Sequence, residues 1–141
     1  MATDTLTRLR RWLLAIFAFG ALGTSVELLL LGHFESGWER VPLVLLGAAI
    51  VVTLWHMAAP SRSSVRTLQV TMLLLLVTGG VGIGLHFDSN VEFELEMYPS
   101  MTGAELIGKT LTGALPVLAP GTITLLGLVG LAHTYRHPAI N

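Results

Sequence analysis

The sequence contains no cysteine among its 141 residues. That absence excludes disulfide bonds, thiolate metal sites and dithiol redox pairs. Charge is also scarce, because Asp, Glu, Lys and Arg together make up 12% of the chain, against about 25% in a typical soluble domain. The formal net charge is −1, so nothing indicates a nucleic-acid partner, and no glycine-rich phosphate loop is present. These absences together argue against a soluble nucleotide- or nucleic-acid-binding domain.

Apolar residues fill the space that charge leaves. They make up 52% of the chain, and the mean hydropathy is +0.72. Four apolar segments approach the roughly 20 residues that a helix needs to cross a bilayer, and in lipid only a helix satisfies its own backbone groups. The first segment is too long for the core of a signal peptide and contains Glu27, so we expect it to be retained. The segments are about 13–32, 41–58, 68–87 and 115–135.

The basic residues predict the orientation of these segments. Six of them lie on the side that carries both termini and two lie on the other side. The positive-inside rule then places both termini in the cytoplasm, as in a small bacterial inner-membrane protein. The expected fold is a single all-α membrane domain over 1–141, with four transmembrane helices in an up-down-up-down bundle. The six are Arg8, Arg10, Arg11, Arg62, Arg66 and Arg136, and the two are Arg40 and Lys109.

A repeated motif suggests that the chain has two related halves. The sequence HFES at 33–36 ends the first apolar segment, and HFDS at 86–89 ends the third. The second and fourth segments each end near a histidine, His56 or His133. The pattern predicts two parallel pseudo-repeated hairpins, about 13–60 and about 67–138, related by an axis along the membrane normal.

The second half also carries an outer loop, at about 88–114. Within it, residues 91–97 alternate between apolar side chains and glutamates. That period of two predicts a short strand, with an ordered acidic loop as the alternative. Thr102 and Glu105 match a capping box, which predicts a short helix ending near Thr112.

The histidines are the first candidate site. In a four-helix bundle the diagonal helices would place His33 opposite His86 near the outer surface, and His56 opposite His133 near the inner surface. Facing histidines at two depths resemble the ligand arrangement of dihaem membrane cytochromes b, and the resemblance implies haem b held between pairs of imidazoles. The chain departs from that family because its histidines lie at helix ends, and no other motif of the family is present. The alternative is that these rings lie in the headgroup region without a ligand.

The outer pair has acids beside it. His33 with Glu35, and His86 with Asp88, could supply two imidazoles and two carboxylates. Such nitrogen and oxygen ligands suit zinc, manganese, iron or copper(II). The alternative is that each histidine and its acid close a loop by hydrogen bonds.

Glu27 is the only acid inside an expected transmembrane helix, and it shares a helical face with Gly20, Gly23 and Thr24. An acid within the membrane is a functional hypothesis by default. A glutamate in the first of four helices resembles the small multidrug-resistance transporters, which would imply proton-coupled transport of small molecules. Those proteins are shorter and lack a long acidic outer loop. A hydrogen bond from Glu27 to Thr24 or to a neighbouring helix is the alternative.

No catalytic residues can be assigned. Because almost no soluble domain exists, we expect a small non-catalytic accessory or assembly subunit of a larger membrane complex. A metal- or haem-binding redox protein that uses His33 and His86 is the alternative, and a transporter that uses Glu27 is a second alternative. The expected partners are the lipid bilayer and other membrane subunits or further copies of the chain.

Overall fold

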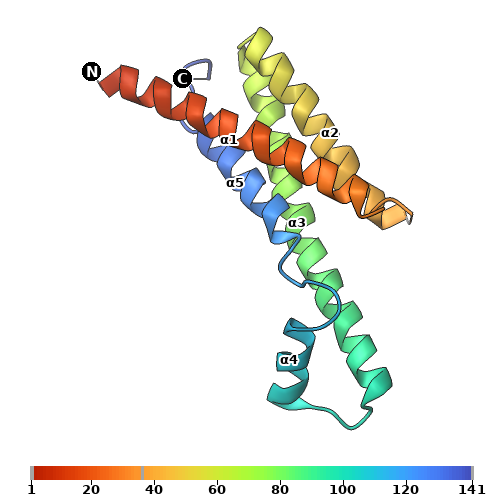
Figure 1. Cartoon of the computed structure of the whole chain (residues 1–141). Coiled ribbons are helices and arrows are strands. Elements are labelled where there is room, and N and C mark those ends of the chain that lie inside the picture. Colours follow the sequence, from red (N-terminus) through yellow and green to blue (C-terminus); the bar gives the residue numbers. More distant parts are fainter. Residues whose placement is uncertain (1, 36, 141) are drawn as a thin grey trace.

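The computed structural model of the protein describes residues 2–35 and 37–140. Over these residues the chain forms five helices joined by turns and loops, and it contains no strand (Figure 1). Three of the helices, α1 to α3, are long and apolar enough to cross a membrane, which fits an integral membrane protein. The helices are α1 (Ala2–Leu30), α2 (Gly37–Ala58), α3 (Arg62–Met97), α4 (Gly103–Leu111) and α5 (Gly121–Thr134).

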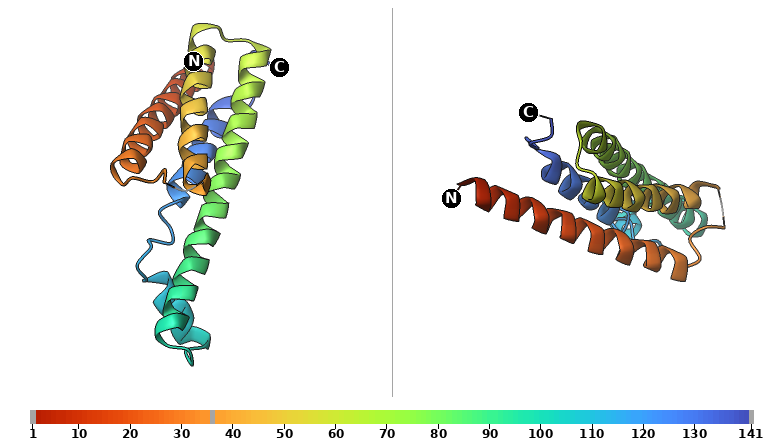
Figure 2. Two further views of the ribbon diagram at one scale, coloured as in Figure 1. Left: turned by 90° about the vertical axis from the view of Figure 1, so that its right-hand side faces the viewer. Right: turned by 90° about the horizontal axis from the view of Figure 1, so that it is seen from above.

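Helix α5 packs closely along α3, and glycines make the approach possible. A Cβ atom on Gly127 would lie 2.7 Å from the Met72 carbonyl oxygen, and one on Gly130 would overlap the Met72 side chain. Helix α2 packs on the other side of α3, and α1 lies obliquely across α5 and α2 (Figures 1 and 2). The core between these four helices consists of Phe17, Ala21, Leu46, Ala49, Leu68, Met72, Leu75, Ile123 and Leu126.

The outer surface of the helices is apolar as well. Phe19 is 83% exposed and Leu30 is 82% exposed, and many other large apolar side chains point outward. Because water would disfavour such a surface, this pattern is typical of helices that face lipid.

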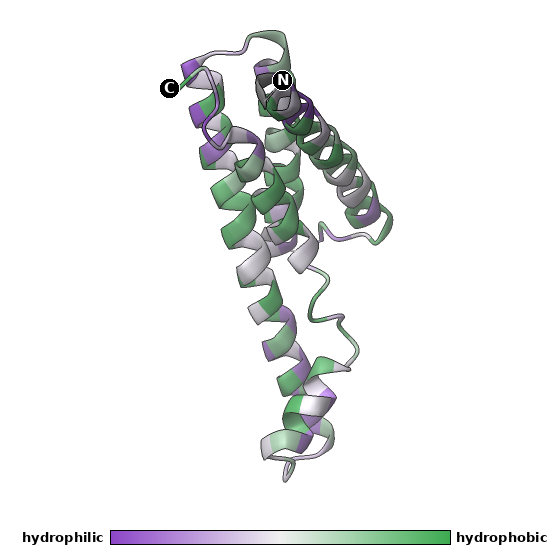
Figure 3. Cartoon of the chain, turned by 90° about the vertical axis from the view of Figure 1, so that its left-hand side faces the viewer, coloured by the Kyte–Doolittle hydropathy of each residue, from purple (hydrophilic) through white to green (hydrophobic). Residues whose placement is uncertain are grey.

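Helix α3 continues through the segment predicted to be a strand, so that prediction is wrong. Its 36 residues extend about 54 Å, well beyond the roughly 30 Å of a bilayer core. Buried or half-buried positions recur along its last turns at Ile83, Phe87, Asn90 and Glu94, which is a helical spacing. A lone strand would leave its backbone groups without partners, whereas a helix satisfies them internally. Polar residues concentrate in this projecting half of α3 (Figure 3).

The fourth apolar segment forms a shorter helix than expected. Helix α5 begins only at Gly121 and has 14 residues, about 21 Å of helix. Two prolines, Pro116 and Pro120, lack the N–H that a helix needs. The residues from 115 to 120 therefore form turns, with a bond from Ala119 N to Pro116 O of 3.0 Å.

The short helix predicted after Thr102 is present as α4 (Gly103–Leu111), although the Thr102 side chain makes no cap bond. Helix α4 packs against the projecting end of α3. The two form a hairpin that extends away from the rest of the molecule (Figure 1).

Candidate metal centre

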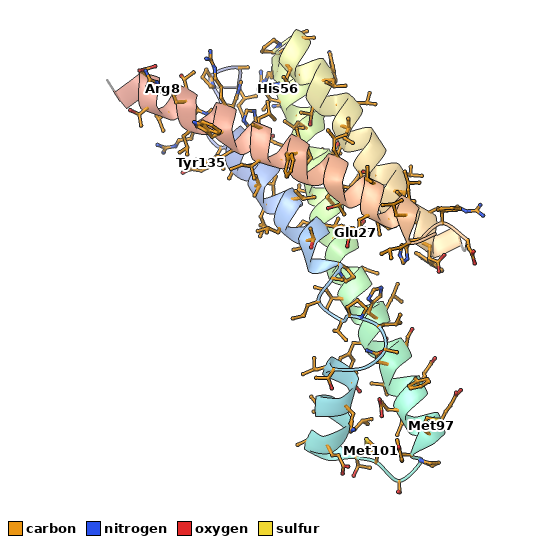
Figure 4. The ribbon with its side chains drawn as sticks, viewed as in Figure 1. Arg8, Glu27, His56, Met97, Met101 and Tyr135 are labelled. Carbon is orange, nitrogen blue, oxygen red and sulfur yellow. The ribbon has the colours of Figure 1, made fainter. Side chains whose placement is uncertain are left out.

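Three histidines meet at the end of the molecule that carries both termini. His56 lies in the last turn of α2, His133 in the last turn of α5, and His137 in the tail that follows α5. One nitrogen of each ring lies within 4.8 Å of the corresponding nitrogens of the other two. Within 2–35 and 37–140, this is the only group of three or more potential His, Asp or Glu ligands that could share one ion. Figure 4 shows His56 and Tyr135 at this end, far from Met97 and Met101.

The start of α3 fixes the orientation of the His56 ring. Ser61 caps α3, and the Ser64 hydroxyl donates to the Ser61 carbonyl oxygen at 3.0 Å. Ser64 Oγ also lies 3.0 Å from Nδ1 of His56. A hydroxyl can donate or accept, so this contact allows both neutral tautomers of His56, and the one with its proton on Nδ1 keeps a free lone pair on Nε2.

A backbone carbonyl does the same for His133. Nδ1 of His133 lies 2.9 Å from the Arg10 carbonyl oxygen, and because a carbonyl can only accept, Nδ1 must carry the proton. The two Nε2 atoms of His56 and His133 then face each other at 3.3 Å. At that distance Nε2–H of His56 can donate to Nε2 of His133, and with both protons on Nδ1 a cation bound between the two lone pairs takes the place of this hydrogen bond. Metal–nitrogen bonds of about 2.0–2.1 Å in a tetrahedral site would place two imidazole nitrogens about 3.3–3.4 Å apart.

The third ring is held differently. The backbone N–H of Ala139 donates to Nδ1 of His137 at 3.2 Å, so a neutral His137 carries its proton on Nε2. Binding of a metal by either nitrogen of His137 therefore requires the bond from Ala139 to break. His137 is the one ring of the three whose proton or partner must move.

Arg10 positions the tail that supplies this ring. Its guanidinium group donates to the carbonyl oxygens of Tyr135 at 3.3 Å and Arg136 at 2.8 Å. Arg136 has a φ of 47°, in the left-handed region that non-glycine residues rarely adopt. We call these two hydrogen bonds the Arg10 clasp, because they join α1 to the turn just before His137.

The surroundings keep His137 uncharged. Burial is the main reason that the pKa of His137 falls from 6.5 to about 4, and repulsion from His56 and then from His133 adds to it. Arg10 contributes the smallest repulsion. A neutral imidazole is the form that binds metals, so the ring is suited to coordination at neutral pH.

The structure also brings the outer histidines together, but without their acids. The rings of His33 and His86 lie 6.5 Å apart, edge to face, and Nδ1–H of His86 donates to the Pro116 carbonyl oxygen at 3.1 Å. Glu35 and Asp88 are exposed and do not join the two rings in a group of three ligands. Asp88 lies two residues after His86 on α3, and residues two apart on a helix point to different faces, so its carboxylate is directed away from the two rings. Ser36 of the repeated motif lies outside the described residues.

Glu27 points away from the interior. Its side chain is exposed on α1, three residues before that helix ends at Leu30 (Figure 4). A Cβ atom added to Gly23, one turn earlier on the same face, would have no neighbouring atom within 4 Å. No helix of the described chain therefore covers this face of α1, and the acid lies outside the core of the molecule.

Three residues of this site, His137, Ser64 and Arg10, were not predicted from the sequence. The spacing of His133 and His137 was the available signal, because two histidines four residues apart recur in metal sites. No family model, curated protein or solved structure matches the chain. The geometry of the three rings therefore carries the functional argument.

Proposed function

We propose that the chain is an integral membrane protein that binds one transition-metal ion between His56, His133 and His137. The observation that carries the proposal is the 3.3 Å separation of the two Nε2 atoms of His56 and His133. Nδ1 of each ring lies at hydrogen-bond distance from an oxygen atom, 3.0 Å for His56 and 2.9 Å for His133. Metal-binding histidines typically hold their second nitrogen in this way, because it fixes the tautomer and the ring orientation.

The donor set indicates the class of metal. Imidazole nitrogens suit zinc, copper(II), nickel and iron, and a chain without cysteine offers no thiolate. Three imidazoles leave one position of a tetrahedral zinc site for water or an exchangeable ligand. We therefore favour zinc, in a site that can exchange its ion at the membrane surface.

Titration of the purified full-length protein in detergent tests this function. Zn²⁺ should bind with one ion per chain by calorimetry, and Co²⁺ should give the visible absorption bands of a tetrahedral complex. The double variant His56→Ala/His133→Ala should lose both signals. The matched control is His33→Ala/His86→Ala, which removes the other facing pair and should keep both.

The outcomes separate the alternatives. Loss of metal in the control alone, or a Soret band that depends on His33 and His86, would instead support the redox protein based on the outer pair. If the wild type binds no metal at all, the inner nitrogens share a proton and our proposal is wrong.

We further propose that the metal centre faces the cytoplasm of a bacterium. Six of the eight basic residues lie near the start of α1, at the start of α3 or after α5, at the end of the molecule that carries this site. The positive-inside rule therefore favours a cytoplasmic location for that end. In intact cells an impermeant thiol reagent should label Ser100→Cys and leave Ser63→Cys unlabelled. The native chain has no cysteine, so each variant carries one reactive thiol, and the opposite labelling would reverse the orientation.

A role as an accessory subunit is our second proposal, and the α3–α4 hairpin favours it. Tyr98, Ile107 and Leu111 are each at least half exposed there, beyond the length of α3 that a bilayer covers. Apolar side chains exposed to water often mark contact sites. Native gels of mild-detergent membrane extracts should show the chain in a larger complex that Ile107→Glu dissociates and Lys109→Glu does not. Migration of the wild type as a free single chain would contradict this proposal.

A further inference from the structure

A groove lies between the beginning of α1 and the end of α5, close to the metal centre but distinct from it. Its volume is about 250 Å³. Leu6, Leu9 and Leu13 form an apolar wall on α1, and Arg10 and Arg136 also line the groove. An apolar wall next to two guanidinium groups can hold a molecule that is itself part apolar and part anionic.

The positive charges of the two arginines are available to bind an anion. Arg10 donates only to backbone carbonyls, and Arg136 lies over the ring of Tyr135 at 5.8 Å. In the part of the chain that the structure describes, the one salt bridge joins Arg8 to Asp4. No described carboxylate therefore neutralises Arg10 or Arg136.

The position of the groove fits the membrane interface. Trp12 is 69% exposed and Tyr135 is 70% exposed, and both belong to this end of the molecule. Exposed tryptophan and tyrosine rings typically lie at the level of lipid headgroups. The groove thus opens where phosphates and the upper parts of acyl chains are found.

We propose that this groove binds one anionic phospholipid, with its phosphate between Arg10 and Arg136 and an acyl chain along the leucines of α1. Guanidinium groups bind phosphate through paired hydrogen bonds, and the burial of each methylene against the leucines adds favourable free energy. The proposal does not require a metal, because the Arg136 guanidinium group and the leucines supply no ligand to the three-histidine cluster.

Native mass spectrometry of the full-length protein tests the proposal. The protein is reconstituted in nanodiscs of equal parts phosphatidylglycerol and phosphatidylcholine, and the lipids retained after release are counted. We expect one retained lipid, with phosphatidylglycerol preferred about tenfold over phosphatidylcholine. Arg136→Gln should abolish that preference, whereas Arg66→Gln, which removes a basic residue outside the groove, should keep it.

Three results would overturn the assignment. Equal retention of the two lipids by the wild type would show no anionic site, and an unchanged preference in Arg136→Gln would place the site elsewhere. Displacement of the retained lipid by millimolar inorganic phosphate would indicate a simple anion site without an acyl chain. Arg136 lies in the tail after α5, and an unchanged midpoint of thermal unfolding for Arg136→Gln provides a separate check that the variant is folded.

Discussion

The two pairs of facing histidines look alike at the level of the rings but differ in what holds them. The inner rings of His56 and His133 are 5.3 Å apart and the outer rings of His33 and His86 are 6.5 Å apart, both edge to face. The inner histidines are each 4% exposed, and Nδ1 of each ring has a hydrogen-bond partner, the Ser64 hydroxyl or the Arg10 carbonyl. The outer rings are only partly buried, and the one hydrogen bond that the structure gives them is from His86 to Pro116. Two features distinguish the inner pair from the outer pair as a candidate metal centre: the hydrogen-bond partners that orient its rings, and a third ring beside them. Ring proximity alone does not.

At the end of the molecule formed by α3 and α4, the side-chain amide of one asparagine holds the elements together. Asn90 of α3 is 1% exposed, and its side chain donates to the carbonyl oxygens of Thr110 at 2.9 Å and Leu115 at 2.8 Å. Its carbonyl oxygen accepts from Leu115 N at 3.0 Å. One side chain thus attaches α4 and the following turns to α3, while histidines join the helices at the opposite end.

The largest effect that we expect comes from this amide. Asn90→Ala removes three hydrogen bonds, leaves both backbone groups of Leu115 without these partners, and should lower the free energy of unfolding by about 2–4 kcal/mol. Zinc affinity should not change, because the metal centre is at the other end. Denaturant unfolding in detergent measures the first quantity and calorimetry the second.

Ser89→Ala, at the exposed neighbouring position, is the matched control and should behave like the wild type. A loss of zinc affinity in Asn90→Ala would show that the two ends of the molecule are coupled. It would contradict our view that each end is held independently.

The Arg10 clasp should give the next largest effect. Arg10→Ala removes both hydrogen bonds to the turn before His137 but keeps the backbone carbonyl that orients His133. We expect zinc affinity to fall about 10–100-fold, as is typical when an outer partner of a metal ligand is lost. Arg11→Ala, an exposed neighbour on α1, should have no effect on calorimetric titration. Equal affinities for the two variants would mean that the tail holds His137 without the clasp.

Much of the fold was predictable from local pattern, and the misses have local causes too. Hydropathy predicted the long helices, and the recurrence of histidine at segment ends predicted which rings would be neighbours. The alternation over 91–97 was misleading because it does not include Asn90, the residue just before it, whose bonds to Thr110 and Leu115 hold this part of α3 against α4 and the turns that follow. Pro116 and Pro120 explain the other difference, because they move the start of the last helix from the expected position near 115 to Gly121.

The candidate site was harder to predict than the helices. His137 follows the last apolar segment, and its position depends on Arg10, more than 120 residues earlier in the chain. The ring orientations of His56 and His133 depend on a hydroxyl at the start of α3 and a carbonyl on α1. Contacts of this kind leave no periodic pattern in the sequence, so beyond the spacing of His133 and His137 the candidate metal centre is recognised from the folded chain.

A smaller effect tests the control of the His56 ring. Ser64→Ala removes the hydrogen-bond partner of Nδ1 of His56, and zinc affinity should fall about tenfold. Ser63→Ala changes the neighbouring residue, which is exposed, and should leave the affinity unchanged. Competition with a coloured zinc chelator is sensitive enough to measure the difference. An unchanged affinity for Ser64→Ala would show that the hydroxyl does not control the ring.

The smallest predicted effect is a dependence of metal-free stability on pH. The pKa of His137 is about 4 in the folded protein against 6.5 as its ordinary value. As the pH falls below 6.5, His137 of the unfolded chain binds a proton while His137 of the folded chain does not. The free energy of unfolding therefore declines down to about pH 4 and then levels off. The midpoint of thermal unfolding, measured with a chelator present, should therefore fall more between pH 7.5 and pH 5 in the wild type than in His137→Gln. The difference between the two proteins reports on His137, and equal shifts would show that this ring is freely protonated in the folded state.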